Sequence, residues 1–231
     1  MEKTEEKTTN NTAIEEMIEA GVGFGHRMSK LHPKMKPYVT KIKDGIGLIN
    51  LEITEKKLNE ALEFIKQAKK EDKTFLFVST NPSLRNIIKK AAEETGSFYV
   101  VERWIGGLLT NFSEIKKRLN YFKELEELIA EPDFAEKYVK KERLEISKTL
   151  ERLKVKFGGV KKMEKIPDVV FILNLEKDNL ALLEAVRVKR TIIALADTNV
   201  DPSEVHYMIP ANDDTVSSVS YVLEKITKSM Q

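Results

Sequence analysis

The ten residues RWIGGLLTNF, at positions 103–112, decide how this chain is built. They follow the apolar run FYVV at 98–101, which predicts a buried strand, and they precede a long helical pattern. The segment holds the only tryptophan of the chain, Trp104, and the glycine pair Gly106 and Gly107. It is therefore predicted to be a structural turn from a strand into a helix, bent where a Cβ atom would clash.

The chemistry of this segment leaves two interpretations open. In the first, Trp104 closes an edge of the core beside Leu108 or Phe112. In the second, the backbone N–H groups meet phosphate oxygens, as helix N-termini with nearby glycines do. Thr110 and Asn111 are candidates to cap the helix that follows.

The bulk composition excludes several classes of protein. The chain has 231 residues, of which 41% are hydrophobic and 33% charged, and a net charge of only +2. Because cysteine is absent, disulfides, a thiol nucleophile and cysteine-based metal sites are excluded. Residues 1–11 are polar and unlike a signal peptide, and no apolar run has the length of a membrane span. We expect a soluble, cytoplasmic protein with a disordered tail at 1–11.

Charge is distributed unevenly along the chain. Residues 27–43 contain no acid and six basic residues, namely Arg27, Lys30, Lys34, Lys36, Lys41 and Lys43. Residues 191–223 contain no lysine or arginine and five acids, namely Asp197, Asp201, Glu204, Asp213 and Asp214. This separation predicts one face for an anionic partner and another face for a different contact. His26 and His32 lack metal-ligand spacing and suit phosphate or stacking contacts better.

Apolar runs alternate with amphipathic helical patterns over most of the chain. Strands are predicted at 74–79, 98–101, 168–173, 191–196 and 207–210. Helices are predicted at 12–21, 54–71, 82–96, 178–188 and 214–230. Such alternation predicts a parallel sheet with helices on both faces. Extended pieces at 39–42 and 46–50 flank Gly45 and indicate a hairpin or an edge strand.

Residues 112–157 interrupt this alternation. A helical stripe of apolar residues is followed by Pro132 and by a second, highly charged helix that Gly158 and Gly159 end. This pattern predicts an antiparallel helical hairpin inserted into an α/β domain made of residues 12–111 and 158–231. Residues 113–165 contain fifteen lysines and arginines and eleven acidic residues. Such a hairpin is either a solvated arm or an arm lying on nucleic acid.

Six short segments in a fixed order carry a family resemblance. They are EAGVGFGH (19–26), PKMKPY (33–38), RWIGGLLTNF (103–112), PD (167–168), DTNVDP (197–202) and IPANDD (209–214). Together they resemble the bacterial form of ribosomal protein S two, the second protein of the small ribosomal subunit, over residues 14–222.

The resemblance implies a flavodoxin-like, doubly wound parallel sheet of about five strands with an inserted coiled-coil hairpin. It implies a structural constituent of the ribosome that is not an enzyme and needs no cofactor or small-molecule substrate. Its implied partners are small-subunit rRNA and other small-subunit proteins, including ribosomal protein S one, without any membrane. The residues expected to bind rRNA are His26, Arg27, Lys30, His32, Lys34, Lys36, Lys41, Lys43 and Arg103.

The chain departs from the family pattern at four positions. Gly23 stands where the family usually has histidine, and Asn81 stands in a turn that usually carries a basic residue. Ala211 replaces a usual glycine, and Val200 replaces a small or thiol residue. RNA contacts at positions 23 and 81 are therefore not carried over from the family.

The rival interpretation is a nucleotide- or magnesium-dependent α/β enzyme. A dinucleotide site needs a G-x-G-x-x-G turn after the first strand, but the turn here is Thr80-Asn81-Pro82, and a P-loop is also missing. Four carboxylates in the acidic region are conceivable magnesium ligands. The alternative, which we favour, is that Asp197 and Asp201 cap a strand end and a proline turn, and that Asp213 and Asp214 cap the last helix. No catalytic residue and no metal ligand is predicted.

Overall fold

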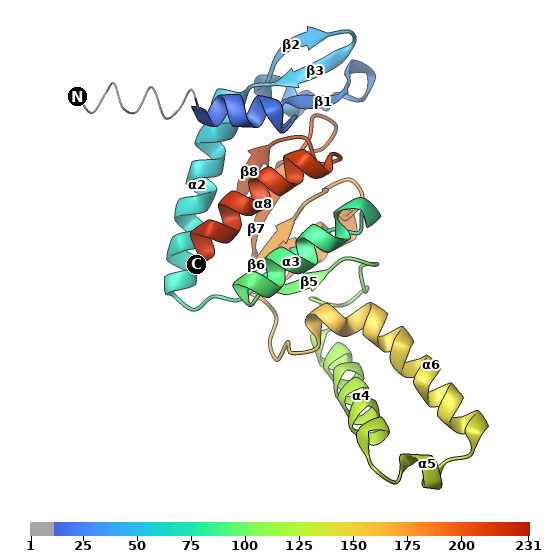
Figure 1. The fold of residues 1–231 in the computed structure, drawn as a ribbon. Helices are drawn as coiled ribbons and strands as arrows, with labels where there is room; N and C mark the ends of the chain where they lie inside the picture. Colours follow the sequence, from blue (N-terminus) through green and yellow to red (C-terminus); the bar gives the residue numbers. More distant parts are fainter. Residues whose placement is uncertain (1–11) are drawn as a thin grey trace.

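A five-stranded parallel sheet lies at the centre of the computed structural model, which describes residues 12–231 (Figure 1). The tail expected at 1–11 lies outside the described residues. The strands are β4 (Phe75–Val78), β5 (Phe98–Val100), β6 (Val169–Ile172), β7 (Thr191–Ala196) and β8 (Tyr207–Pro210). All five predicted strands are confirmed. Their spatial order, β5-β4-β6-β7-β8, is the flavodoxin-like order 2-1-3-4-5.

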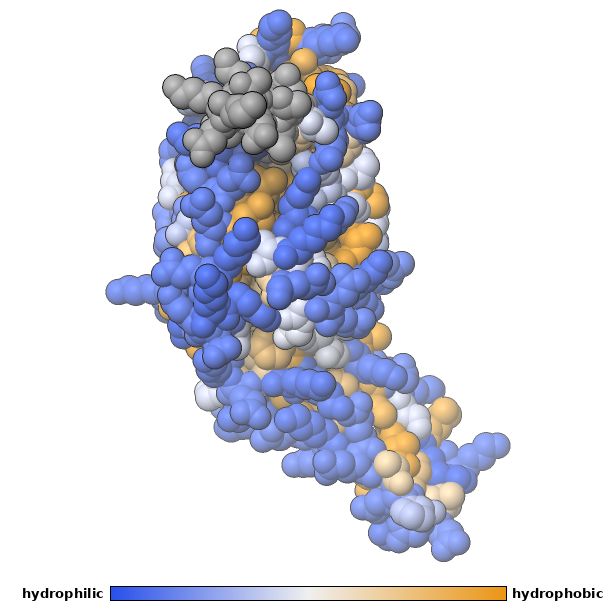
Figure 2. All heavy atoms as spheres, turned by 60° about the vertical axis from the view of Figure 1, so that its left-hand side comes forward, coloured by the Kyte–Doolittle hydropathy of each residue, from blue (hydrophilic) through white to orange (hydrophobic). Residues whose placement is uncertain are grey.

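The two faces of this sheet bury different apolar clusters, because successive side chains of a strand point to opposite faces. Phe77 and Phe171 meet edge to face, 5.5 Å apart, on the face covered by α2 (Leu51–Lys70), α3 (Arg85–Thr95) and α8 (Val216–Met230). Leu76 and Val78 point to the other face, where α7 (Asn179–Arg187) and the 103–112 segment pack. Figure 2 shows the side of the molecule on which α2 lies, and most of the side chains on this surface are hydrophilic.

Helix α2 begins three residues earlier than predicted. The side chain of Asn50 accepts hydrogen bonds from the N–H groups of Glu52 and Ile53, at 3.0 and 3.4 Å. Asn50 is therefore a helix cap rather than the end of the preceding strand, and the strand stops at Ile49. Helix α3 follows a short 3₁₀ turn, η3 (Pro82–Leu84), and ends at Gly96 as predicted, with a φ of 65°.

A second, three-stranded antiparallel sheet forms near the N-terminus, with the order β1-β3-β2. A helix over residues 12–19 precedes it. Its elements are β1 (Phe24–Arg27), η1 (Met28–Lys30), η2 (Pro33–Tyr38), β2 (Val39–Lys43) and β3 (Ile46–Ile49). Asp44 and Gly45 join β2 to β3 with φ angles of 52° and 77°. Two positive φ angles in an Asp-Gly pair are typical of a two-residue hairpin turn, so the hairpin alternative is confirmed.

Two long helices extend from the parallel sheet, α4 (Phe112–Ala130) and α6 (Lys140–Phe157), with the short α5 (Phe134–Lys137) between them (Figure 1). Helices α4 and α6 pack against each other. Ile115, Leu119 and Phe122 are buried in the same apolar cluster as the sheet residues, so the base of α4 is part of the core. After α6 the chain passes Tyr99 so closely that a Cβ atom on Gly159 would collide with the Tyr99 carbonyl oxygen.

The 103–112 segment is held by one carboxylate, that of Glu184 on α7. Its Oε1 accepts hydrogen bonds from the indole Nε1–H of Trp104 at 2.9 Å and from the N–H of Gly107 at 2.8 Å. Its Oε2 accepts from the N–H of Leu109 at 3.1 Å and from both the N–H and the hydroxyl of Thr110 at 3.2 Å. The backbone N–H groups of the turn therefore meet an anion, but this anion belongs to the chain itself.

These contacts decide between the two interpretations of the segment. Trp104 lies in the same apolar cluster as Leu108, with Phe112 packed against that cluster, and the N–H groups of the turn are bonded to Glu184, which favours the structural turn over a phosphate site. Of the two candidates to cap α4, Asn111 lies at the N-cap position, whereas Thr110 does not. The hydroxyl of Thr110 is bonded to Glu184, and Asn111, at the N-cap position, makes no side-chain cap bond.

We predict that Glu184→Gln lowers the free energy of unfolding at pH 7 by on the order of 3 kcal/mol, because a charged acceptor buried among five donors is lost. Burial by itself raises the pKa of Glu184, but the hydrogen bonds from Trp104, Gly107, Leu109 and Thr110 outweigh it and lower the pKa. A lowered folded-state pKa stabilises the protein above the unfolded pKa, about 4.3, and this contribution is lost as the pH falls through the folded pKa.

The difference in the free energy of unfolding between wild type and Glu184→Gln should therefore be smaller at pH 4 and below than at pH 7. Urea denaturation at these pH values measures it. Glu124, exposed on α4, provides the control, since Glu124→Gln should change stability little at either pH. Equal stability of Glu184→Gln and wild type at pH 7 would contradict the prediction.

Candidate functional site

The six basic residues of the 27–43 segment all lie on the surface. Within residues 12–231, Lys34 is the one member of this set whose side chain has a hydrogen-bond or ion-pair partner. Its Nζ lies 2.7 Å from Oδ2 of Asp201 and 2.6 Å from the hydroxyl of Ser203. Lys34 thus fastens η2 to the loop after β7, while the other five cations remain available to solvent.

Three of these cations share one face of the small sheet. Directly paired residues of an antiparallel sheet lie on the same face. Lys43 and Arg27 both pair with Ile46, and Lys41 pairs with Leu48, two residues further along β3. We call the surface formed by Arg27, Lys41 and Lys43 the basic face.

The opposite side of the small sheet packs on the body of the molecule. Ile49 and Gly47 on that side are buried. A Cβ atom on Gly25 would lie 2.5 Å from Cγ2 of Thr198, so β1 approaches the end of β7 as only glycine allows. Because the sheet is supported from behind, the basic face is held in place before any partner arrives.

Thr198 is the main anchor of this support. Its hydroxyl accepts a hydrogen bond from the N–H of His26 at 2.8 Å, and its carbonyl oxygen accepts one from the N–H of His32 at 2.8 Å. The Nδ1 of His32 in turn accepts from the N–H of Lys34 at 3.3 Å and caps η2. His32 therefore has a structural role at the start of the turn that carries Lys34 and Lys36.

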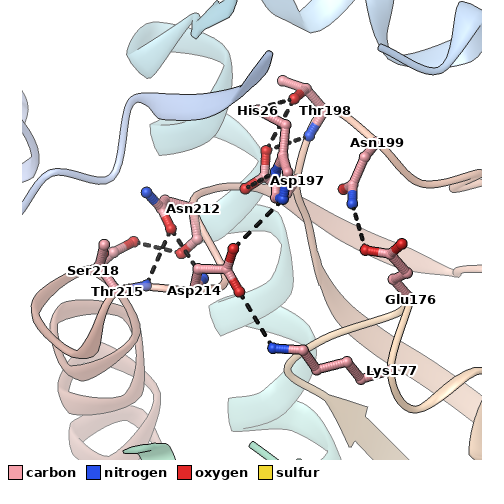
Figure 3. A network of polar contacts seen from close by, with 10 residues as sticks. All are labelled: His26, Glu176, Lys177, Asp197, Thr198, Asn199, Asn212, Asp214, Thr215 and Ser218. Atoms are coloured by element: carbon pink, nitrogen blue, oxygen red, sulfur yellow. Dashed lines mark hydrogen bonds and ion pairs between the residues drawn. The ribbon is translucent and has the colours of Figure 1, made fainter. Parts of the chain in front are cut away.

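The structure separates His26 and Arg103 from the other residues predicted to bind rRNA. Both ring nitrogens of His26 face carboxylates, with Nδ1 3.0 Å from Asp197 and Nε2 3.5 Å from Asp214 (Figure 3). The hydrogen bond to Asp197 raises the pKa of His26. Arg103 is exposed in the segment before α4 and lies outside the small sheet.

Three acidic residues of the 191–223 region, Asp197, Asp213 and Asp214, lie at the carboxyl ends of β7 and β8, whereas Glu204 lies near Arg190 at their amino ends. Asp214 bridges His26 and the ammonium group of Lys177, which lies 3.5 Å from it (Figure 3). Asp197 and Asp213 are each only 1% exposed. Within residues 12–231, no group of three or more histidine, aspartate or glutamate side chains has an arrangement that could hold a metal ion.

The roles expected of these carboxylates are confirmed in part. Asp197 accepts from the N–H of Thr198 at the strand end, and Asp201 accepts from the N–H of Ser203 at 3.0 Å in the proline turn. The prediction that Asp213 and Asp214 cap the last helix was wrong. The side chain of Asn212 accepts from the N–H groups of Asp214 and Thr215, at 2.9 and 3.2 Å, and so holds the turn before α8 (Figure 3).

The carboxyl group of Asp213 is buried close to two other carboxylates, those of Asp197 and Asp214. Burial, and after it the negative charges of Asp197 and Asp214, raise the pKa of its carboxyl to about 8. Within the described residues, its buried Oδ1 has no hydrogen-bond partner. The folded chain therefore binds a proton at Asp213 at pH values where the unfolded chain, with a pKa of about 3.9, has released it.

We predict that the contribution of Asp213 to the free energy of unfolding falls as the pH rises between about 4 and about 8, by up to about 1.4 kcal/mol per pH unit, because the folded state binds the extra proton in this window. Asp213→Asn removes this proton uptake, so the variant should be more stable than wild type at pH 8 and should lose less stability between pH 5 and pH 8. Urea denaturation at pH 5, 6.5 and 8 measures the difference.

The control for this experiment is Asp44→Asn, which changes an exposed carboxylate in the β2–β3 turn to a residue that also accepts a positive φ. Its pH profile should parallel that of wild type. If the profile of Asp213→Asn is also parallel to wild type, Asp213 does not titrate in this range.

The crevice that binds nucleotides in folds of this class is occupied by the chain itself. Such ligands bind outside the carboxyl ends of the strands where the strand order reverses, here between β4 and β6. Asp178, 1% exposed, reaches into this place and accepts hydrogen bonds from the N–H of Thr80 at 3.2 and 3.3 Å. Burial raises the pKa of Asp178.

The fold and these contacts define a flavodoxin-like α/β protein with a small, exposed basic sheet packed at the end of β7. The family model described as Ribosomal protein S2 matches residues 17–231. The chain belongs to the ribosomal protein S2 family.

Individual relatives agree with this assignment. The Small ribosomal subunit protein uS2 of Dictyoglomus thermophilum is 42% identical over 217 residues, which cover 94% of this chain and 88% of the relative. The protein of the same name from Petrotoga mobilis is 39% identical and covers 94% and 75%, respectively. That from Geotalea uraniireducens is 36% identical over 221 residues, 96% of this chain and 86% of the relative.

Membership in this family makes the chain a structural constituent of the small ribosomal subunit and a component of translation. It is not an enzyme, so the alternative of a nucleotide- or magnesium-dependent enzyme is set aside. Small-subunit membership implies rRNA and other ribosomal proteins as partners. No helix within residues 12–231 is both long and apolar enough to cross a membrane.

Proposed function

We propose that the basic face, together with Lys30 and Lys36 of the adjoining turns, anchors this chain to rRNA in the small subunit. The observation that carries the proposal is a set of five exposed cations without side-chain partners in residues 12–231, on a sheet already fixed to the body. Cations held in this way lose little conformational freedom when they bind phosphates. Lys34 fastens the η2 turn to the loop after β7 through its ion pair with Asp201, and its positive charge lies beside the basic face.

We predict that the double variant Lys41→Glu and Lys43→Glu weakens binding to small-subunit rRNA fragments and flattens its salt dependence. Each phosphate contact contributes about 0.7–0.9 to the slope of log K against log salt concentration. The loss of two contacts should therefore reduce the slope by about 1.4–1.8. Filter binding or fluorescence anisotropy at several salt concentrations measures it.

The matched control is Lys66→Glu with Lys70→Glu, which makes the same charge change on the exposed side of α2. It should alter the slope much less, because these residues lie outside the small sheet. A slope that is the same for wild type and for the Lys41 and Lys43 variant would refute the proposed anchor.

We also propose that residues 112–157 act as an arm that reaches a second part of the subunit. The excess of basic residues in and after α4 and α6 supports a contact with rRNA. The carboxyl edge around Asp197 and Asp214, whose carboxylates already pair with His26 and Lys177, is better suited to a protein neighbour. Ribosomal protein S one is the neighbour that the family resemblance suggests for this chain.

We predict that removing the outer part of the arm leaves the rest of the protein folded. The buried residues of α4 extend to Leu125, so a deletion of 128–147 bridged by a short Gly/Ser linker spares them. The shortened protein should unfold cooperatively but enter small subunits poorly in reconstitution, as followed by gradient sedimentation. Normal incorporation would mean that the arm is only a solvated appendage, and loss of the cooperative transition would mean that it supports the core.

A further inference from the structure

Phe24 is the most exposed aromatic side chain near the basic face. It lies in β1 and is 54% exposed, although the neighbouring Val22 is fully buried. Gly25 is pressed against Thr198 on the body side, and this contact leaves Phe24 on the outer side of the sheet. An outward phenyl ring at a supported position exposes apolar surface that the fold itself does not use.

The strand register places Phe24 on the same face as the cations, although β1 is irregular between Phe24 and Arg27. Phe24 and Lys41 both pair with Leu48, so these three residues form one row across the sheet. The next row consists of Arg27, Ile46 and Lys43. All six side chains share one face, because paired residues and residues two apart along β3 point to the same side. Two strand spacings, about 10 Å, separate the backbone at Phe24 from that at Lys41.

We propose that Phe24 is a stacking platform for an unpaired nucleobase, and that the basic face binds the phosphates of the same single-stranded RNA segment. This rests on the proposed anchoring to rRNA and specifies what kind of RNA the site takes. Proteins recognise single-stranded RNA by stacking bases on aromatic side chains of a sheet while cations follow the backbone. A double helix offers this face only phosphates, because its bases are already stacked on each other.

Charge complementarity favours RNA over a protein as the occupant. The two rows contain three cations and no acid, and Asp44 lies beyond them in the turn between β2 and β3. Ile46 and Leu48 are partly exposed between the cations and provide apolar contact for a sugar or a base edge. An apolar protein surface covering Phe24 would bury these cations without counter-charges, which is costly.

The test compares Phe24→Leu and Phe24→Trp with wild type in the full-length protein. The leucine variant keeps apolar volume but removes the aromatic face, and the tryptophan variant keeps a face that reports stacking by fluorescence. The probes are a single-stranded oligoribonucleotide and a blunt RNA duplex with the same number of phosphates. Ile42→Ala is the control, since Ile42 is 59% exposed on the other side of the same small sheet, paired with Gly47.

We expect Phe24→Leu to bind the single strand about tenfold more weakly than wild type, as removal of one stacking ring does. Its duplex affinity, its salt slope and its thermal unfolding should match wild type. Phe24→Trp should retain the affinity and lose fluorescence intensity on adding the single strand, after subtraction of the signal of Trp104. Ile42→Ala should behave as wild type on both probes.

Equal single-strand affinities of Phe24→Leu and wild type would overturn the stacking platform while leaving the salt-dependent anchor intact. If that variant also entered small subunits poorly, Phe24 would be assigned to a protein neighbour and the proposal would fall in the same way. The anchor fails separately, if wild type itself binds neither probe or if the variant of Lys41 and Lys43 keeps the wild-type salt slope.

Discussion

The buried carboxylate of Glu184 is the constraint on which the rest of this fold depends. A turn that leaves a sheet edge exposes backbone N–H groups, and burying them without acceptors would be costly. Glu184 accepts from three such groups, from a hydroxyl and from the indole of Trp104. Because Glu184 lies on α7, this contact fixes the exit from β5 against the helix that follows β6. The direction in which α4 leaves the sheet follows from it.

The same solution recurs at the carboxyl edge of the sheet. Asp178 accepts from the N–H of Thr80 in the crevice where a nucleotide phosphate would bind in related folds. In both places an internal anion takes the position of a ligand. The parallel sheet therefore serves as a structural support. The exposed basic residues lie instead on the small sheet, which hydrogen bonds to Thr198 hold against the parallel sheet.

Much of the fold could be predicted from local patterns. The five parallel strands and the helices that cover them were found because apolar periodicity is a property of neighbouring residues. Boundaries failed where a side-chain contact decided them. Asn50 looked like the end of a strand but caps α2, and Asn212 rather than the adjacent acids holds the turn before α8. One signal for Glu184 was present, since an acid stands on the otherwise apolar face of the α7 pattern beside Ala181 and Ala185.

The sequence by itself determined the class of fold, the family and the set of cations, since each is encoded in composition, in short motifs or in their order. Tertiary structure decided which of those cations share a face and what each carboxylate does. The partners of Glu184 and Asp178 lie about 80 and 98 positions away in the chain, so no local pattern pairs them. His26 shows the same limit. Its motif placed it in a basic segment, but the folded chain turns its ring toward Asp197 and Asp214, because the end of β7 lies directly behind β1.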